Sequence, residues 1–482
     1  MDLFFNQINK GSTNLSKILS IDLQTNGKLI AILQNSLNTP AFNSTKLCDI
    51  IEERLNNQLL STSTRFKLLI ESFLNYCSKV DPWSIWNNID LIFQYYQDLT
   101  NLVSSFVTIS DLPNVISLNI QLCELFRSMT LFIIPISLKV DAVYSTSVST
   151  TNKNDYIFTT QLTLFLAKFF QSIKPLNNRL NEKERNPKNE LLLWVVNRLN
   201  NLYIKIGSSS SCNNIFQNIS HKIGNDVAGI KSIHKFDVLE YRFILGRFYL
   251  MQNKLTKAFY HLNQTYTELS CLYEFYHFQQ FYINIEKVLK YLLPLGLVLG
   301  KIPKLQTPII NNNPHLAEYQ NLAKITMSGD LSLFNEWMTR NQDILLKENV
   351  YILLLDKLPL IILRNCIKNI FQITTYPASN KISYEVISRG LQYSCRDFAF
   401  GGVSKNSLTL MFQDLDIFNV ENVLITLITY NLLKGNCFPM NKVMVTMKNV
   451  SINEIFPPIN EKILVKFPVA NGDEKDSWLY QL

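Results

Sequence analysis

The sequence has 482 residues, 47% of them hydrophobic, so it is long enough for two or three domains with sizeable cores. Its formal net charge of +8 is a mild bias that permits a nucleic-acid or acidic partner but equally fits an ordinary, slightly basic protein. The eight cysteines are scattered and form no CxxC pair, which excludes a disulfide-stapled secreted domain and indicates a reducing compartment, cytosol or nucleus.

Neither a signal peptide nor a membrane span is expected. The apolar run at the N-terminus is short and follows an early acidic residue, Asp2. Proline or charged residues interrupt the apolar segments 291–300 and 351–363 well before the ~18 residues that a spanning helix needs. We therefore expect a soluble protein without membrane insertion.

Helical periodicity dominates the first half of the chain. Apolar residues recur on one face in residues 61–76, 89–107, 115–140, 156–173 and 191–206, and each of these segments predicts a helix. Polar, Ser/Thr/Asn-rich or proline-bracketed stretches predict loops at 144–155, 174–190 and 207–235, and a further gap at 396–416.

Residues 236–271 form the clearest repeat unit. Gly246 and Ala258 lie twelve residues apart, as the small residues of a tetratricopeptide repeat do, because two antiparallel helices approach closely only where side chains are small. Gln252 and Asn253 supply the turn. One such pair cannot bury its own faces, so we expect segments 282–299 and 316–337 to stack on it, with a turn at 328–330.

The last third predicts three helices and then a hairpin, which is the order of a winged helix. The helices are expected at 349–370, from about Ser383, and at 419–434, where Asn419 is the N-cap and Gly435 the end. The hairpin strands are 436–438 and 442–448, joined by a turn at 439–441. The fold class is thus mainly α: a TPR-like helical-repeat superhelix capped by a C-terminal winged-helix subdomain. We divide it into residues 1–230, 231–345, 346–470 and a tail, 471–482.

The predicted third helix is a poor reader of duplex DNA. Its polar face carries Asn422, Thr426, Thr429 and Asn431, without the Arg or Lys that contacts phosphates and guanine edges. The hairpin is different, because lysines surround and follow it: Lys434, Lys442, Lys448, Lys462 and Lys466. They are the candidate nucleic-acid-binding residues, suited to phosphate contact without sequence reading. The alternative, solvated lysines that protect strand edges from aggregation, stays equally open.

No pattern supports catalysis, a cofactor or a metal. The sequence lacks GxxxxGK[ST], GxGxxG, HExxH and GxSxG. The five histidines are far apart, and no two have a ligand spacing on one helix. Trp83 and Trp86, after Pro82, more often anchor packing than bind a ligand. We expect a protein that is not an enzyme.

Several segments resemble the PCI-domain family, named for the proteasome lid, the signalosome and an initiation factor. One branch, with a signalosome-associated subunit and the PCI subunit of the TREX-type nuclear mRNA-export complex, is matched at YLLPLGLVLGK (291–301), SGD (328–330), KLPL (357–360) and RN (364–365). The fungal export subunit is resembled further at 26–34, TRFK (64–67), SFLNY (72–76), VDPWSIW (80–86), NCFP (436–439) and PPINE (457–461).

The resemblance implies a scaffold or adaptor subunit in the nucleus, at the nuclear pore, that couples transcription to mRNA export. Its implied partners are a large PCI-type scaffold subunit, a small acidic disordered peptide shared with the proteasome lid, and RNA or DNA. Two adjacent winged helices would form a composite basic surface for nucleic acid. The alternative is a scaffold of a signalosome or lid-like particle that binds no nucleic acid.

Overall fold

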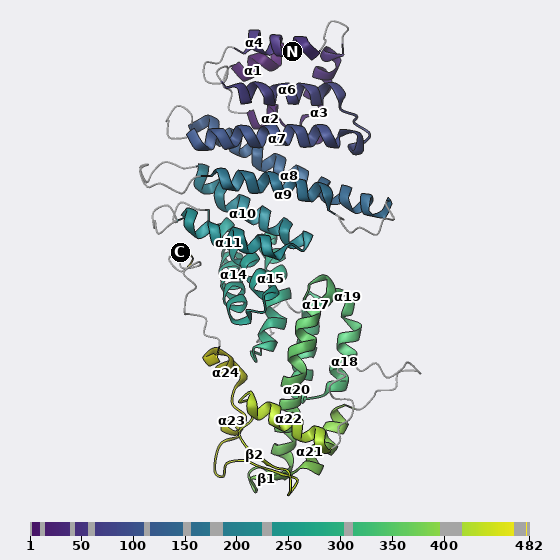
Figure 1. Ribbon diagram of the computed structural model, residues 1–482, viewed down its shortest axis with the longest axis vertical. Coiled ribbons are helices and arrows are strands. Elements are labelled where there is room, and N and C mark those ends of the chain that lie inside the picture. The colour runs from purple at the N-terminus through teal and green to yellow at the C-terminus, as the bar shows by residue number, and fades with distance from the viewer. Residues whose placement is uncertain are drawn as a thin grey trace. The chain divides into compact units, whose positions relative to one another are not determined.

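The chain divides into two compact units. The computed structural model describes residues 2–9, 15–38, 44–55, 63–109, 116–147, 156–173, 187–223, 234–302, 312–395, 417–466 and 479 (Figure 1). Unit 1 comprises Met1–Tyr241 with Asp473–Leu482, and unit 2 comprises Arg242–Gly472. The structure is mainly helical, with one small antiparallel sheet of three strands in unit 2.

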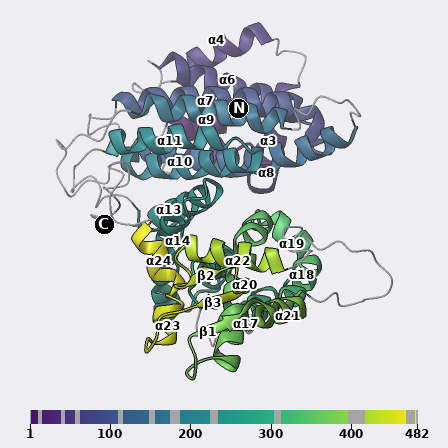
Figure 2. The same ribbon diagram turned by 60° about the horizontal axis from the view of Figure 1, so that its bottom comes forward.

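Unit 1 is built from helices, and most of those that follow one another in sequence pack side by side (Figures 1 and 2). They are α1 (Asp2–Asn9), α2 (Leu15–Ile18), α3 (Leu23–Leu37), α4 (Ser44–Arg54), α6 (Thr64–Lys79), α7 (Ile85–Ile109), α8 (Ile116–Ser147), α9 (Ile157–Ser172), α10 (Pro187–Ile206), α11 (Ser209–Ile223) and the start of α13 (Lys235–Met251). The five helices predicted between residues 61 and 206 are therefore confirmed. The helical period of the apolar residues predicts these helices because each helix packs one apolar stripe against a neighbouring helix.

Helix α11 corrects one prediction. Residues 207–235 were expected to be irregular because they begin with Gly207 and a run of serines, yet Ser209–Ile223 is helical and buries Cys212, Phe216 and Ile219. Tertiary burial overrides the weak local propensity of serine here. The predicted loops 144–155 and 174–190 are also too long, because α8 runs to Ser147 and α10 begins at Pro187. Residues 148–155, 174–186, 224–233 and 396–416 lie outside the described residues.

A carboxylate on one helix of unit 1 caps the N-terminus of the next helix. Asp141 near the end of α8 is 2% exposed and accepts hydrogen bonds from the backbone N–H of Phe158 (3.0 Å) and from the N–H (2.9 Å) and hydroxyl (2.6 Å) of Thr159. Tyr156, at the N-cap of α9, makes no side-chain cap. Asp141 therefore satisfies first-turn donors of α9 from the neighbouring helix.

One stretch of α8, Ile120–Val143, is long and apolar enough to cross a membrane by length and composition alone. A helix was predicted over residues 115–140, but it was not counted as a candidate span. A core helix meets the same criterion, and α8 packs against α7, α9 and α10.

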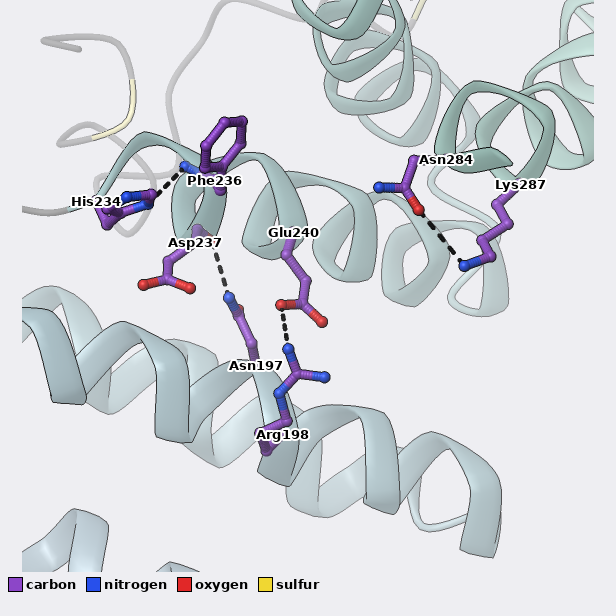
Figure 3. Close-up of polar contacts among 8 residues, drawn as sticks. All are labelled: Asn197, Arg198, His234, Phe236, Asp237, Glu240, Asn284 and Lys287. Carbon is purple, nitrogen blue, oxygen red and sulfur yellow. Dashed lines mark hydrogen bonds and ion pairs between the residues drawn. The ribbon is translucent and has the colours of Figure 1, made fainter. Parts of the chain in front are cut away.

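The first turns of α13 are bound to α10 within unit 1 (Figure 3). Asn197 donates its side-chain N–H to the backbone oxygen of Asp237 at 2.8 Å. Arg198 forms an ion pair with Glu240, also at 2.8 Å. Both contacts lie in the half-buried layer between the two helices, so they align α13 on α10 with polar as well as apolar contacts.

Unit 2 starts with helices, continues with the sheet and ends with two short helices. Its elements are the rest of α13, α14 (Leu255–Tyr276), α15 (Gln279–Val298), α17 (Pro314–Ser328), α18 (Leu331–Arg340), α19 (Gln342–Lys347), α20 (Tyr351–Thr374), β1 (Lys381–Ser383), α21 (Tyr384–Ser394), α22 (Ile417–Thr429), β2 (Asn436–Phe438), β3 (Val443–Val445), α23 (Ile452–Ile455) and α24 (Ile459–Lys466). The close approach predicted from Gly246 is confirmed: a Cβ there would lie 2.8 Å from Cγ of Leu262.

Helix α20 is the hub of unit 2, in contact with α15, α17, α18, α21 and α22. Its Arg364, 6% exposed, donates to the backbone oxygens of Leu432 (3.3 Å), Phe456 (2.9 Å) and Pro457 (2.8 Å). Its Asn369 donates to the backbone oxygens of Met327 and Ser328 at the C-terminal end of α17. One helix thereby ties together α17 and the segments on both sides of the sheet.

The sheet has the order β1-β3-β2, and both pairings are antiparallel. The hairpin of β2 and β3 was predicted; the edge strand β1 was not. Two predicted limits of the third helix are wrong. Helix α22 begins at Ile417, so Asn419 lies inside it, and it ends at Thr429 because Asn431 adopts φ 56°, a left-handed conformation that Asn tolerates, before Gly435 is reached.

Candidate nucleic-acid interface

The register of the sheet separates an inner face from an outer face. Ile382, Met444 and Cys437 are cross-strand partners on the inner face, where Ile382 and Met444 are buried. Two rows of partners form the outer sheet face: Lys381–Val445–Asn436 and Ser383–Val443–Phe438. Because side chains alternate along a strand, these six residues share one side of the sheet, opposite the core.

Backbone contacts hold the hairpin in this register. Lys442 lies in the β2–β3 turn at φ 51°, donates its N–H to Pro439 and accepts the N–H of Tyr384, the first residue of α21. Next to β1, Asn380 and Thr446 exchange hydrogen bonds, at 2.9 Å in both directions. A side chain at Gly435 would lie 3.1 Å from the backbone oxygen of Val445, so a small residue suits the entry to β2.

Three of the five candidate lysines surround the hairpin. Lys434 precedes β2, Lys442 is in the turn and Lys448 follows β3, and all three are exposed. Residues 434–453 contain no Asp or Glu, so no carboxylate of the hairpin itself neutralises these ammonium groups. The electrostatics of the hairpin are therefore those of a small cationic surface.

The other two candidates lie on a different element. Lys462, half-buried, and Lys466 belong to α24, which packs its Ile459 against Gly300 and lies alongside α14 (Figures 1 and 2). A Cβ at Gly300 would be 2.6 Å from Cβ of Ile459, so this contact is close. The structure thus brings Lys434, Lys442 and Lys448 together and places Lys462 and Lys466 on another surface of unit 2.

Helix α22 presents an uncharged face, in keeping with the prediction. Its apolar stripe, including Val420, Leu424 and Leu427, is buried. Its exposed positions Asn422, Ile425 and Thr429 carry no charge. This helix therefore lacks the cations with which a recognition helix reads duplex DNA.

Sequence reasoning missed Lys381 and the apolar side chains beside the lysines. Lys381 is exposed on the outer sheet face, level with Asn436 across β3. Phe438 is 45% exposed and Met440, in the turn, is 97% exposed. A strand of three residues has no readable alternation, so only the cross-strand register could place Lys381; the exposed turn could have been read from its position next to Pro439.

The surface around the hairpin combines positive charge with exposed apolar side chains. Ammonium groups contact phosphates, and an aromatic or thioether side chain beside them offers a flat apolar contact for an unstacked base. Among the described residues, no three His, Cys, Asp or Glu side chains are placed to hold a metal ion.

Comparison with known proteins shows which proteins the chain is similar to. It is 33% identical over 453 residues to the nuclear mRNA export protein THP1 of Saccharomyces cerevisiae, covering 93% of this chain and 94% of that protein. It is 24% identical to a PCI domain-containing protein of Schizosaccharomyces pombe over 74% of this chain and 73% of the relative. It is 26% identical to COP9 signalosome complex subunit 12 of Kluyveromyces lactis, over 53% and 59%.

No protein-family model matches the sequence. The identity to THP1 nevertheless extends over nearly the whole of both chains, through both units. The chain belongs to the family of PCI-domain proteins that includes the nuclear mRNA export protein THP1.

Proposed function

We propose that this protein is a non-enzymatic scaffold subunit of a nuclear complex that couples transcription to mRNA export at the nuclear pore. Support comes from the relative THP1, whose name gives mRNA export and which matches over 93% of this chain. In this proposal the chain supplies binding surfaces rather than chemistry, and its site of action is the nucleus.

The proposal assigns a domain role to each part of unit 2. Helices α13 to α18 act as a TPR-like stack, in which Gly246 and Ala258 allow the first pair to pack closely. The segment from α20 to β3 acts as a winged-helix subdomain: the order helix, strand, helix, helix, strand, strand supports it. The cap and the stack are joined through Asn369 of α20, which donates to the backbone oxygens of Met327 and Ser328 at the end of α17.

One observation carries the nucleic-acid part: a cationic hairpin without carboxylates that adjoins an exposed sheet face. Lys434, Lys442 and Lys448, with Lys381 beside them, offer phosphate contacts, while the uncharged face of α22 argues against base reading in duplex DNA. We infer weak, sequence-independent binding of RNA or DNA, strengthened when a partner's basic surface lies next to this one.

The test is binding of a labelled single-stranded RNA to the purified complex. Reversal of all three hairpin lysines to Glu should weaken binding by at least about tenfold, since each lost phosphate contact also lowers the release of counterions. The matched control reverses three exposed lysines on helices elsewhere, Lys28, Lys168 and Lys324, and should leave binding nearly unchanged. An equal loss of RNA affinity in both triple variants would show that net charge alone matters, and the hairpin would then not be the binding site.

Partners are proposed from the same surface. The implied partners are a large PCI-type scaffold subunit and a small acidic disordered peptide shared with the proteasome lid. Met440 and Met447, 97% and 62% exposed, lie at either end of β3 on the hairpin, where burial against a scaffold subunit would remove apolar area from water. Co-expression with the scaffold should raise the soluble yield and the melting temperature of the chain. A chain that melts alone at the same temperature as in the complex would contradict an obligate partner.

A second function, a scaffold of a signalosome-like particle without nucleic-acid binding, is favoured by one relative, the COP9 signalosome subunit of Kluyveromyces lactis. The RNA-binding assay separates the two functions, because this one predicts no retardation by the purified complex at any salt concentration. Identification of the proteins that co-purify from nuclei gives an independent answer.

A further inference from the structure

A cavity of about 170 Å³ opens in unit 2 between α14 and α24, away from the sheet. Its wall is formed by apolar and uncharged polar side chains and by one cation: Thr256, Phe259, Tyr260, Asn263, Leu299, Lys301, Asn460 and Ile463. No carboxylate lies among these lining residues. The cavity is therefore a partly apolar pocket with a single positive charge.

The backbone turn at Gly300 and the ring of Phe259 fix the position of the Lys301 ammonium group. Helix α15 ends in a left-handed Gly300 at φ 71°, and the N–H of Lys301 donates to the backbone oxygen of Gly296 at 2.9 Å. The side chain of Lys301 then folds back so that its Nζ lies 3.9 Å from the centre of the Phe259 ring. Burial lowers the pKa of Lys301, and no ion pair or hydrogen bond of its ammonium group is found among the described residues. An anion next to it would replace the water that burial removes.

A second polar group in the same wall lacks a partner. Thr256, in the first turn of α14, is 8% exposed, and its hydroxyl makes no hydrogen bond within the described part of the chain. A hydroxyl in the cavity wall without an acceptor among the described residues can donate its proton to a ligand oxygen. Lys301 and Thr256 line the same cavity, so both offer donors to a ligand bound there.

We propose that this cavity binds a carboxylate carried on an apolar body, with the Lys301 ammonium and the Thr256 hydroxyl donating to its oxygens. One ammonium group balances the single charge of a carboxylate, whereas a phosphate monoester carries between one and two charges and would remain partly uncompensated. Phe259, Leu299 and Ile463 receive the apolar body. The carboxylate can belong to a small metabolite or to the terminal or acidic residue of a polypeptide, because both present the same group.

The experiment uses the full chain and three probes of one shape: 3-phenylpropionate, 3-phenylpropionamide and phenyl phosphate, measured by saturation-transfer NMR. The acid should bind saturably and at least about tenfold more tightly than the amide, the size expected for a charge-assisted hydrogen bond in a partly buried site. Binding of the amide or the phosphate as tight as the acid, or no binding by any probe, would overturn the assignment.

Matched variants locate the site. Lys301→Met keeps the apolar stem and should reduce binding of the acid by about tenfold while leaving the weak binding of the amide unchanged. Thr256→Val should weaken the acid several-fold, and Thr256→Ser should retain most of the affinity. Lys324→Met, at an exposed lysine on α17, is the control. An unchanged affinity in Lys301→Met would exclude this cavity even if the acid binds elsewhere.

The source of the carboxylate is distinguished by a further arm. A short peptide ending in phenylalanine, compared with its C-terminal amide, should compete with 3-phenylpropionate if the natural ligand is a polypeptide terminus. If the peptide does not compete with 3-phenylpropionate, the natural ligand is assigned as a free small acid. Both results depend on Lys301 and are independent of the hairpin lysines, so this inference stands or falls separately from the proposed function.

Discussion

Gly329, between α17 and α18, lies against the backbone of Cys366 on α20: a Cβ built on Gly329 would be 2.5 Å from both the Cα and the amide nitrogen of Cys366. Its φ of 79° is left-handed as well. Ser394 closes the same corner, because its hydroxyl donates to the oxygen of Gly329 and accepts the N–H of Leu331. The turn between α17 and α18 is therefore in contact with both α20, through Cys366, and α21, through Ser394.

Gly329→Ala should therefore destabilise unit 2 by about 3 kcal/mol, since neither the backbone of α20 nor the left-handed turn can accommodate a methyl group at low cost. Urea unfolding measured by circular dichroism checks the value. Gly27→Ala is the control: Gly27 is helical and a Cβ there would meet nothing within 4 Å, so alanine should stabilise by up to about 1 kcal/mol. Similar effects at both glycines would contradict the close approach.

Arg364→Lys should cost about 2–4 kcal/mol, although the charge is kept. The guanidinium of Arg364 serves three backbone oxygens from two directions, and an ammonium group cannot reach all of them. Burial also lowers the pKa of Arg364 to about 10. Thermal unfolding of Arg364→Lys should be compared with that of Arg389→Lys, an exposed position on α21 that should change stability by less than about 0.5 kcal/mol.

Asp141→Ala should destabilise unit 1 by about 2 kcal/mol, at the upper end for a helix cap, because it leaves the first-turn donors of α9 buried without acceptors. Asp141→Asn, which keeps one acceptor oxygen, should lose less. Asp90→Asn, at an exposed aspartate of α7, is the control. Hydrogen exchange of the backbone N–H groups of Phe158 and Thr159 gives the local readout. Unchanged protection of these groups in Asp141→Ala would show that Asp141 does not cap α9.

His261 should make unit 2 less stable in acid. It is 1% exposed and stacks on Tyr249 at 5.7 Å, and burial, with nearby Arg242 and Lys257, lowers its pKa to about 3. Since the unfolded pKa is near 6.5, the unfolded chain binds a proton that the folded chain excludes below that pH. Its contribution is thus fully present above about pH 6.5 and declines by about 1.4 kcal/mol per pH unit toward pH 3.

The variant His261→Phe isolates this effect, because phenylalanine fills the stack but does not titrate. The free energy of unfolding of the wild-type chain, minus that of the variant, should fall between pH 6.5 and pH 4.5. A difference that is flat over this range would show that the imidazole accepts its proton in the folded state.

The salt dependence of RNA binding tests the hairpin more finely than affinity alone. For a single strand, each phosphate contact contributes about 0.7 to the slope of log K against log salt, so Lys434→Gln, Lys442→Gln and Lys448→Gln together should lower the slope by about 2. Lys462→Gln, on α24, should leave it unchanged if the sheet region alone contacts RNA. An equal change from Lys462→Gln would extend the contact surface to α24.

The sequence by itself determined the features that depend on near neighbours in the chain. The helical segments between residues 61 and 206, the small residues Gly246 and Ala258, and the turn at Gly329 were readable because helix period, size and backbone freedom are local properties. The lack of cations on α22 was readable for the same reason.

The tertiary structure alone decided which distant residues meet. The pairing of β1 with β3 places Lys381 on the outer sheet face, and the packing of α24 on Gly300 separates Lys462 from the hairpin and closes the cavity at Lys301. Such contacts join residues that lie far apart in the chain, and their free energy comes from burial against partners that no local pattern encodes.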